Sequence, residues 1–128
     1  MPTTSSVTVS FWGKYKTISG EFDGYLEHTG RLLMFLKRAK EIDEFVNNGD
    51  FMLLDPISGK PSYNKHESKP PREYDTLEDA MEKESKDYNY LFKDAKWWII
   101  NDDGSLSRLN ETLKENGISF YVRGEKTG

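Results

Sequence analysis

The chain has 128 residues, of which 31% are charged and 13% aromatic, and its formal net charge is −4. Without a cysteine it can form no disulfide, no thiolate nucleophile and no cysteine zinc site. The acidic balance makes nucleic acid an unexpected partner, because broad phosphate binding needs clustered Lys and Arg. No apolar run reaches the roughly 18 residues of a membrane span. We therefore expect one domain over residues 1–128, away from membranes and in the cytoplasm.

Alternating residues near the N-terminus predict the first β-structure. Val7, Val9 and Phe11 alternate with polar residues, and an extended run resumes over residues 15–22 after Trp12-Gly13-Lys14. The pattern predicts either a hairpin or one strand bent at Gly13.

A long helix is predicted next, from about residue 30 to residue 48. Apolar residues recur there at helical spacing, Thr29 stands where a helix cap is expected, and Gly49 follows as a left-handed stop. The apolar run 51–54 is too short for a helix and predicts either a buried strand or a plug into the core.

The segment 55–74 differs from its surroundings because it holds four of the five prolines and has no apolar period. We expect a long Pro-rich loop within the domain. Loops of this length are usually either functional or disordered.

The C-terminal half predicts two shorter helices and further strands. Thr76 and Asp79 have capping-box spacing ahead of a helix to about residue 85, and residues 88–100 predict a hairpin. Leucines from 106 to 113 indicate a helix ending at Gly117, and residues 118–122 a last strand. The segments together predict an α+β fold with a mostly antiparallel sheet, one long helix and two shorter helices.

One candidate ligand site combines Asp23, Tyr25, Thr29, Gly30 and Arg31. A helix that starts at Thr29 would offer free N–H groups and its dipole to a phosphate, Arg31 would add a charged fork, and Tyr25 would stack on a base. The segment lacks the Lys-Ser or Lys-Thr pair of a Walker loop. The alternative is structural: the glycines supply tight turns and Asp23 accepts turn N–H bonds.

Catalysis by His28 is not expected. No Ser or Cys nucleophile motif stands near it, and the other histidine, His66, lies in the Pro-rich loop. We expect a protein that is not an enzyme and that needs no cofactor and no metal.

Acidic residues are concentrated over residues 73–87, where Glu73, Glu78, Asp79 and Glu82 are candidate contacts for a basic partner. The alternative is a solvated helix face. In the pair Trp97-Trp98 the indoles point to opposite faces of a strand. One is expected in the core, and the other, assigned to Trp98, is expected to be exposed as an anchor for a partner.

The run Phe22-Asp-Gly-Tyr-Leu-Glu-His-Thr-Gly-Arg-Leu-Leu33, the pair Gly49-Asp50 and the run Tyr90-Leu-Phe-Lys-Asp-Ala-Lys-Trp97 resemble a group of small bacteriophage and prophage proteins. The similarity covers about residues 18–100 and departs from the shared pattern at Glu21, Leu26 and Ala95. The resemblance implies a phage origin and expression in the cytoplasm of a bacterial host. It transfers no catalytic residue.

The residues and the resemblance favour a non-enzymatic phage protein that binds and inhibits a host protein, such as a CRISPR nuclease or another defence factor. The contact would use the Pro-rich loop, the acidic segment and an exposed Trp. The alternative is a sponge that holds a small nucleotide signal at the helix start near Arg31. The oligomeric state stays open, because the strand edges at residues 7–11 or 118–122 would either pair with a second copy or be covered by the protein's own chain.

Overall fold

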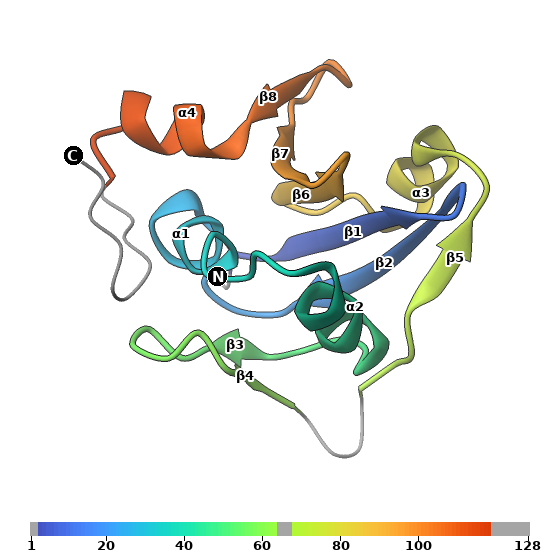
Figure 1. Ribbon diagram of the computed structural model, residues 1–128, viewed down its shortest axis with the longest axis horizontal. Helices are drawn as coiled ribbons and strands as arrows, with labels where there is room; N and C mark the ends of the chain where they lie inside the picture. The colour runs from blue at the N-terminus through green and yellow to red at the C-terminus, as the bar shows by residue number, and fades with distance from the viewer. Residues whose placement is uncertain (1–2, 64–67, 119–128) are drawn as a thin grey trace.

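The computed structural model describes residues 3–63 and 68–118, and its centre is a six-stranded sheet with the order β5-β2-β1-β6-β7-β8 (Figure 1). β1 and β6 are parallel, and the other neighbouring pairs are antiparallel. The predicted α+β fold with a mostly antiparallel sheet is confirmed. The six strands are β1 Ser5–Phe11, β2 Lys14–Gly20, β5 Arg72–Tyr74, β6 Tyr88–Lys93, β7 Lys96–Ile100 and β8 Leu106–Arg108; a separate pair joins β3 Leu53–Leu54 to β4 Pro61–Ser62.

β1 and β2 form a hairpin with a two-residue turn at Trp12 and Gly13. The ladder closes with Phe11 opposite Lys14, and the turn residues have positive φ angles of 56° and 76°. This kind of turn matches the twist of the strands and favours Asn-Gly, because most side chains are strained at positive φ. Of the two predicted alternatives, the hairpin is correct.

β1 lies in the middle of the sheet, between β2 and β6. Of the two alternatives for residues 7–11, an edge covered by the protein's own chain is correct, because this strand is paired on both sides. The two edge strands of the six-stranded sheet, β5 and β8, have three residues each. The other predicted edge, at 118–122, falls outside the described residues except for Ile118.

The hydrophobic core lies between one face of the sheet and the helices α1 (Arg31–Leu33), α2 (Ala39–Asn47) and α4 (Leu109–Glu115). Strand alternation brings Val7, Val9 and Ile18 to this face, where all three are fully buried. Each helix is short, so burial of its apolar side stabilises it more than its intrinsic propensity does. The helix residues in the core are Leu32, Leu33, Ile42, Phe45, Val46, Leu109 and Leu113.

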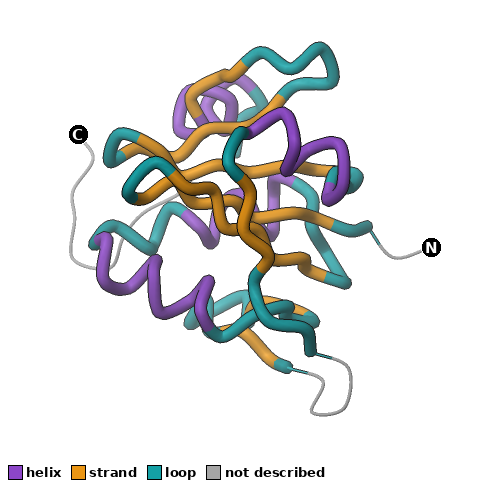
Figure 2. The backbone as a smooth tube through the Cα atoms, turned by 90° about the vertical axis from the view of Figure 1, so that its right-hand side faces the viewer, coloured by secondary structure: helices purple, strands orange, loops and turns teal. Residues whose placement is uncertain are grey.

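The helix α3 (Leu77–Glu84) packs against β2 and β5. In the ladder, Arg72 lies opposite Thr17 and therefore on the face that is turned away from Ile18. Its side chain bonds to Glu84 at the end of α3. α3 therefore covers the second face of the sheet, and Figure 2 shows helices on both sides of the strands.

The predicted single helix over residues 30–48 is wrong. The chain forms a π-helical turn, Leu26–Gly30, then α1, and it resumes helical structure only at α2. Arg38 is extended, with φ −92° and ψ 135°. The indole of Trp97 donates a hydrogen bond to the carbonyl oxygen of Leu36 at 3.0 Å, so a tertiary contact satisfies this carbonyl where the helix has stopped.

The predicted end of the second helix, the cap of α3 and the hairpin at 88–100 are confirmed, whereas the last helix begins later than predicted. Gly49 follows α2 with a φ of 85°, and Thr76 caps α3 by accepting a hydrogen bond from the N–H of Asp79 at 3.1 Å. The hairpin at 88–100 appears as β6 and β7. Leu106 belongs to β8, and the last helix begins only at Leu109.

The segment 55–74 is not one continuous loop, because it contains β4 and β5. β5 begins directly after Pro71, at an edge position where a sheet tolerates proline. Of the strand predicted at 51–54, only β3 is a strand, while Phe51 makes an isolated parallel bridge to Gly20.

The two segments on which the resemblance rests meet in the core. The hydroxyl of Tyr90, a fully buried side chain, donates a hydrogen bond to the carbonyl oxygen of Gly24 at 2.7 Å. Burial raises the pKa of Tyr90 well above its ordinary value. The turn at residues 23–25 is therefore tied to the central strand β6.

Candidate interaction surface

Trp12 is the most exposed large apolar side chain among the described residues, with 99% of its surface accessible. It stands at the tip of the β1–β2 hairpin in a left-handed conformation that costs a non-glycine residue about 1 kcal/mol or more. An indole in water, held by a strained backbone, contributes nothing to the core. Both features favour a role in contacting another molecule.

The predicted anchor, Trp98, is in a different situation. Its side chain is half-buried, its indole N–H donates to the carbonyl oxygen of Lys93 at 3.0 Å, and the guanidinium of Arg108 lies 5.5 Å from the ring centroid. The fully exposed indole is that of Trp12 and not that of Trp98. Sequence reasoning missed it because Trp12 interrupts a strand pattern, which indicates a turn and not a contact.

A groove with a volume of about 610 Å³ opens beside Trp12, between the hairpin and α2. Val9, Phe11 and Ala39 supply apolar surface, and the ring of Phe11 continues inward to Phe92 at a centroid distance of 6.2 Å. Charged residues of both signs surround it: Lys14, Lys16, Lys40, Asp43 and Glu73. The groove offers an apolar floor next to an aromatic anchor.

The predicted acidic contacts are all exposed: Glu73, Glu78, Asp79 and Glu82. Glu73 lines the groove from β5, and the other three lie on α3. An ion pair between Lys14 and Asp75 joins the hairpin to the segment that connects β5 with α3. This hydrogen bond raises the pKa of Lys14 and lowers the pKa of Asp75.

The groove opens on the α2 face of the sheet, and the acidic side chains of α3 lie over the other face. The two regions adjoin at the end of the hairpin, where Lys14 pairs with Asp75, and we call them together with Trp12 the hairpin–α3 surface. Figure 1 shows α3 next to the end of the hairpin, with β5 along β2. The surface draws its residues from three segments that are far apart in the sequence. Only the acidic part had a signal in the sequence, as a local excess of Asp and Glu.

A polar network under this surface fixes β5 to α3. Nη2 of Arg72 donates to Oε1 of Glu84 at 2.9 Å, and Nη1 donates to Oδ1 of Asp50 at 2.8 Å. The hydroxyl of Tyr74 donates to the other oxygen of Glu84 at 2.5 Å. Burial works against the charge of Glu84, but the bonds from Arg72 and Tyr74 outweigh it and lower the pKa of this carboxyl. The bond to Glu84 raises the pKa of Tyr74 to about 12.

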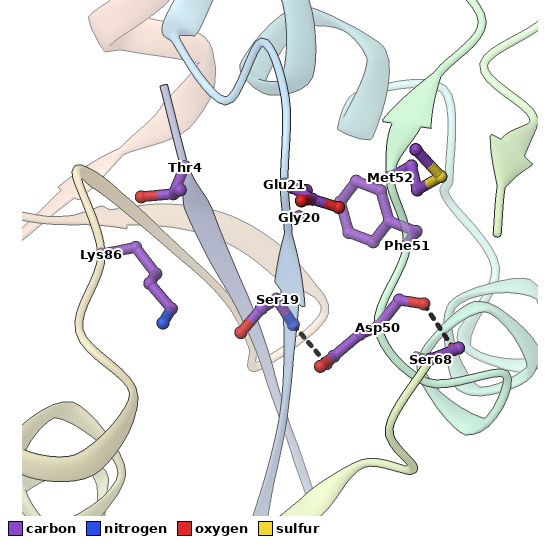
Figure 3. Close-up of a pocket in the computed structure, with 9 residues that line it drawn as sticks. All are labelled: Thr4, Ser19, Gly20, Glu21, Asp50, Phe51, Met52, Ser68 and Lys86. Atoms are coloured by element: carbon purple, nitrogen blue, oxygen red, sulfur yellow. Dashed lines mark hydrogen bonds between the residues drawn. The ribbon is translucent and has the colours of Figure 1, made fainter. Parts of the chain in front are cut away.

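A smaller polar pocket of about 240 Å³ lies at the other end of β2 (Figure 3). Of its two carboxylates, those of Glu21 and Asp50, the one of Asp50 accepts a hydrogen bond from the backbone N–H of Ser19 at 2.8 Å. The hydroxyl of Ser68 donates to the Asp50 carbonyl oxygen at 2.7 Å. With Arg72 as a further donor, Asp50 is engaged in holding three segments together. This pocket therefore has a structural explanation.

The residues of the predicted ligand site do not form a phosphate cradle. Thr29 is fully buried, and its hydroxyl donates to the carbonyl oxygen of Asp23 at 2.8 Å. Gly30 is buried too, and its N–H points to the carbonyl oxygen of Tyr25 at 3.4 Å. Thr29 lies inside the π-helical turn and caps no helix. The expected helix start is wrong, because the chain is already helical four residues earlier.

Arg31 is likewise engaged within the fold. It donates to the carbonyl oxygens of Glu27 and Pro56 at 3.3 and 3.1 Å. Tyr25 keeps 36% of its surface exposed, and its ring lies near the ring of His28, at a centroid distance of 6.2 Å.

The structural alternative holds in part. A Cβ at Gly24 would lie 2.7 Å from the carbonyl oxygen of Thr4, so this position needs glycine, but Asp23 accepts a bond from the Thr29 hydroxyl through its carbonyl oxygen.

His28, the candidate that was set aside, bonds through Nε2 to the carbonyl oxygen of Leu54 at 2.7 Å. Within residues 3–63 and 68–118, no three or more His, Asp or Glu side chains are grouped so that they could hold a metal ion. In the same part of the chain, no helix has the length and apolarity to cross a membrane.

Comparison with known proteins adds no relative: no family model, no curated protein and no solved structure matches the chain.

Proposed function

We propose that this chain is a non-enzymatic, phage-encoded binding protein that inhibits a host defence protein through the hairpin–α3 surface. The observation that carries the proposal is the fully exposed Trp12 on a strained turn, beside an apolar groove and next to exposed acidic residues. The phage origin and the host cytoplasm as its location come from the sequence resemblance and are part of the proposal.

The chemistry of the surface defines the partner. An indole that enters a pocket on a partner is the kind of side chain that supplies most of the binding energy in an interface. Glu73, Glu78, Asp79 and Glu82 would face Lys and Arg on that partner and speed association by electrostatic attraction. A protein that handles nucleic acid, such as a CRISPR nuclease, presents basic surface of this kind.

Binding of this type needs no reaction at the surface. Covering a basic channel excludes its nucleic acid, so occupancy alone inhibits the partner. The engaged side chains of Asp50, Arg72 and Glu84 hold the surface in one shape before binding, which lowers the ordering cost of association.

The test is phage infection of bacterial strains that each carry one defined defence system, with and without this protein. The expected result is restored phage growth in one of these strains. Trp12→Ala should abolish the effect, whereas Ile57→Ala, at a residue that is 88% exposed on the segment after β3, should leave it intact.

Charge reversal tests the acidic part separately. Glu78→Lys, Asp79→Lys and Glu82→Lys combined should weaken binding to the purified defence protein, while Asp102→Lys, Glu111→Lys and Glu115→Lys combined, at exposed residues outside this surface, serve as the charge-matched control. Equal inhibition by wild type, Trp12→Ala and the triple variant would overturn the proposed surface. Unchanged phage growth across a broad panel of defence systems would overturn the proposed function.

A further inference from the structure

β5 is paired with β2 on one side only, so its other side is an edge of the six-stranded sheet. Figure 1 shows it as the border of the sheet below α3. The backbone N–H and C=O groups along such an edge are able to bind a further strand. Which of these groups point outward depends on how the neighbouring strands are paired.

The turn of the β1–β2 hairpin fixes the direction of the backbone groups in β2. Across a two-residue turn, Phe11 and Lys14 exchange both of their backbone hydrogen bonds, and such pairs alternate along antiparallel strands with pairs that exchange none. The even-numbered residues of β2 therefore bond to β1, and the odd-numbered ones point away from it. Ser19 agrees with this alternation, because its N–H donates to Asp50 and its carbonyl oxygen accepts from Phe51.

The same alternation leaves the backbone of Glu73 unpaired. Tyr15 lies opposite Tyr74, and Thr17 lies opposite Arg72. Arg72 and Tyr74 therefore exchange bonds with β2, whereas the N–H and C=O of Glu73 point outward. Neither of these two groups has a hydrogen-bond partner in the part of the chain that the structure describes.

The free edge is short and centred on Glu73. The preceding outward position is occupied by Pro71, which has no N–H, and a sheet edge tolerates proline there. Glu73 is exposed, and its carboxylate has no hydrogen bond or ion pair among the described residues. Lys16, opposite it on β2, donates instead to the side-chain oxygen of Asn47 at 3.1 Å. One residue thus presents an unpaired N–H, an unpaired C=O and an unpaired negative charge.

We propose that an extended segment of the host protein binds to β5 as an added antiparallel strand, with Lys or Arg opposite Glu73. Main-chain bonds supply affinity in this mode of recognition, and opposite charges in directly facing positions stabilise the strand pair. α3 packs against β5 from the other face and adds negative charge through exposed side chains: Glu78, Asp79 and Glu82. The identity of the partner rests on the proposed function, whereas the conformation and charge of the bound segment follow from β5.

The first test is a titration of the full-length, ¹⁵N-labelled protein, followed by its backbone amide NMR signals. The probe is a short peptide that alternates lysine with valine and is blocked at both ends. It should shift the Glu73 signal in a saturable manner at about millimolar concentrations. The signal of Ser107, in the other edge strand β8, should not move.

Two N-methylated peptides are matched probes for the added strand. Methyl groups on the lysine amides remove the donors that would pair with Glu73 and should weaken binding at least about tenfold. Methyl groups on the valine amides alter only the opposite edge of the peptide and should leave binding unchanged. A peptide with glutamate in place of lysine should bind about fivefold more weakly.

Glu73→Pro tests the same edge in the protein. It removes the outward N–H but none of the bonds of Arg72 and Tyr74 to β2, so peptide binding, measured on the Tyr74 signal, should weaken at least about tenfold. Glu73→Gln keeps the N–H, loses only the charge and should weaken binding about fivefold. If Glu73→Pro does not fold, Glu73→Gln and the methylated peptides on wild type decide the outcome.

No shift of the Glu73 signal, an equal shift of the Ser107 signal, or equal binding of the lysine-methylated peptide would each overturn the added strand. A shift of the Glu73 signal on raising the protein concentration without peptide would assign the edge to a second copy instead of the host protein. Inhibition that is lost in Trp12→Ala but intact in Glu73→Pro would refute the added strand and leave the proposed function standing. Peptide binding together with unchanged phage growth in every strain would refute the proposed function and leave β5 as a site for extended basic segments.

Discussion

Arg72 and Glu84 are joined by two hydrogen bonds to a single carboxylate oxygen, 3.3 Å from Nε and 2.9 Å from Nη2 of the guanidinium. The pair is mostly shielded from water, with 26% and 14% of the two side chains exposed. It connects an edge strand of three residues with a helix of eight. Neither element is long enough to be stable alone, so the pair holds both in place.

Replacing Arg72 with Ala should lower the free energy of unfolding by about 2–4 kcal/mol, because it leaves the carboxylates of Asp50 and Glu84 without their shared partner. Arg72→Lys should recover only part of this loss, since an ammonium cannot reproduce the planar fork. Urea unfolding measures the change, and Arg38→Ala, at an ion-paired arginine with 86% of its side chain exposed, is the control. A loss in Arg72→Ala as small as in the control would show that the network carries no stability.

The same network predicts a loss of stability in acid. Bonds from Arg72 and Tyr74 lower the pKa of Glu84 below its ordinary value of 4.5 despite partial burial. A lowered pKa in the folded state contributes stability that is present above the unfolded-state pKa and is lost as the pH falls through the folded one. Wild type should therefore exceed Glu84→Gln in stability at neutral pH, and the difference should shrink below about pH 4.5.

Urea midpoints measured from about pH 7 to about pH 3 check this behaviour. Glu111→Gln, at an exposed carboxylate, should follow the wild-type curve throughout. A gap between wild type and Glu84→Gln that stays constant down to the lowest pH would contradict a lowered pKa at this position.

The mostly antiparallel sheet could be predicted because strand periodicity and turn residues can be recognised within short stretches of sequence. Alternation at Val7 and Val9 and the turn residues of the β6–β7 hairpin each lie within one short window. The parallel pairing of β1 with β6 joins residues 83 positions apart, such as Ser5 and Tyr88, and no window contains both. β5 was missed for a related reason, since its three residues follow two prolines and gain their strand geometry only from β2.

The candidate interaction surface shows the same difference between features set by local sequence and features set by contacts between distant residues. The exposure of the acidic residues followed from their local excess of charge, and it is confirmed. The break between α1 and α2 coincides with a bond from Trp97 to Leu36, which are far apart in the sequence. The phosphate site was placed at Thr29 because no signal in the sequence indicated the π-helical turn that begins at Leu26. Trp12 was not among the predicted partner contacts, because the exposure of a side chain is a property of the assembled surface and not of the turn sequence.

Tyr90→Phe should destabilise the fold by about 1–3 kcal/mol, although it removes only one oxygen. The lost hydroxyl leaves the buried carbonyl of Gly24 without its partner, and a buried unpaired acceptor costs this much. Tyr88→Phe, on the same strand but only half-buried, is the matched control and should change stability by less than about 0.5 kcal/mol. Equal losses in both variants would mean that the Gly24 bond does not anchor the turn at residues 23–25.

Trp12→Asn separates stability from function at one residue. Asparagine tolerates the left-handed conformation that the turn requires, and Asn-Gly is the preferred pair for a two-residue hairpin. With 99% of Trp12 exposed, its removal loses almost no packing, so the free energy of unfolding should rise by about 0.5–1 kcal/mol. Inhibition of the host partner should disappear in the same variant, because the aromatic anchor is gone.

Urea unfolding measures the effect on stability, and the phage growth assay measures the effect on inhibition by the same variant. Lower stability would show that the indole packs against its own fold, and retained inhibition would show that the strained tryptophan serves a different purpose.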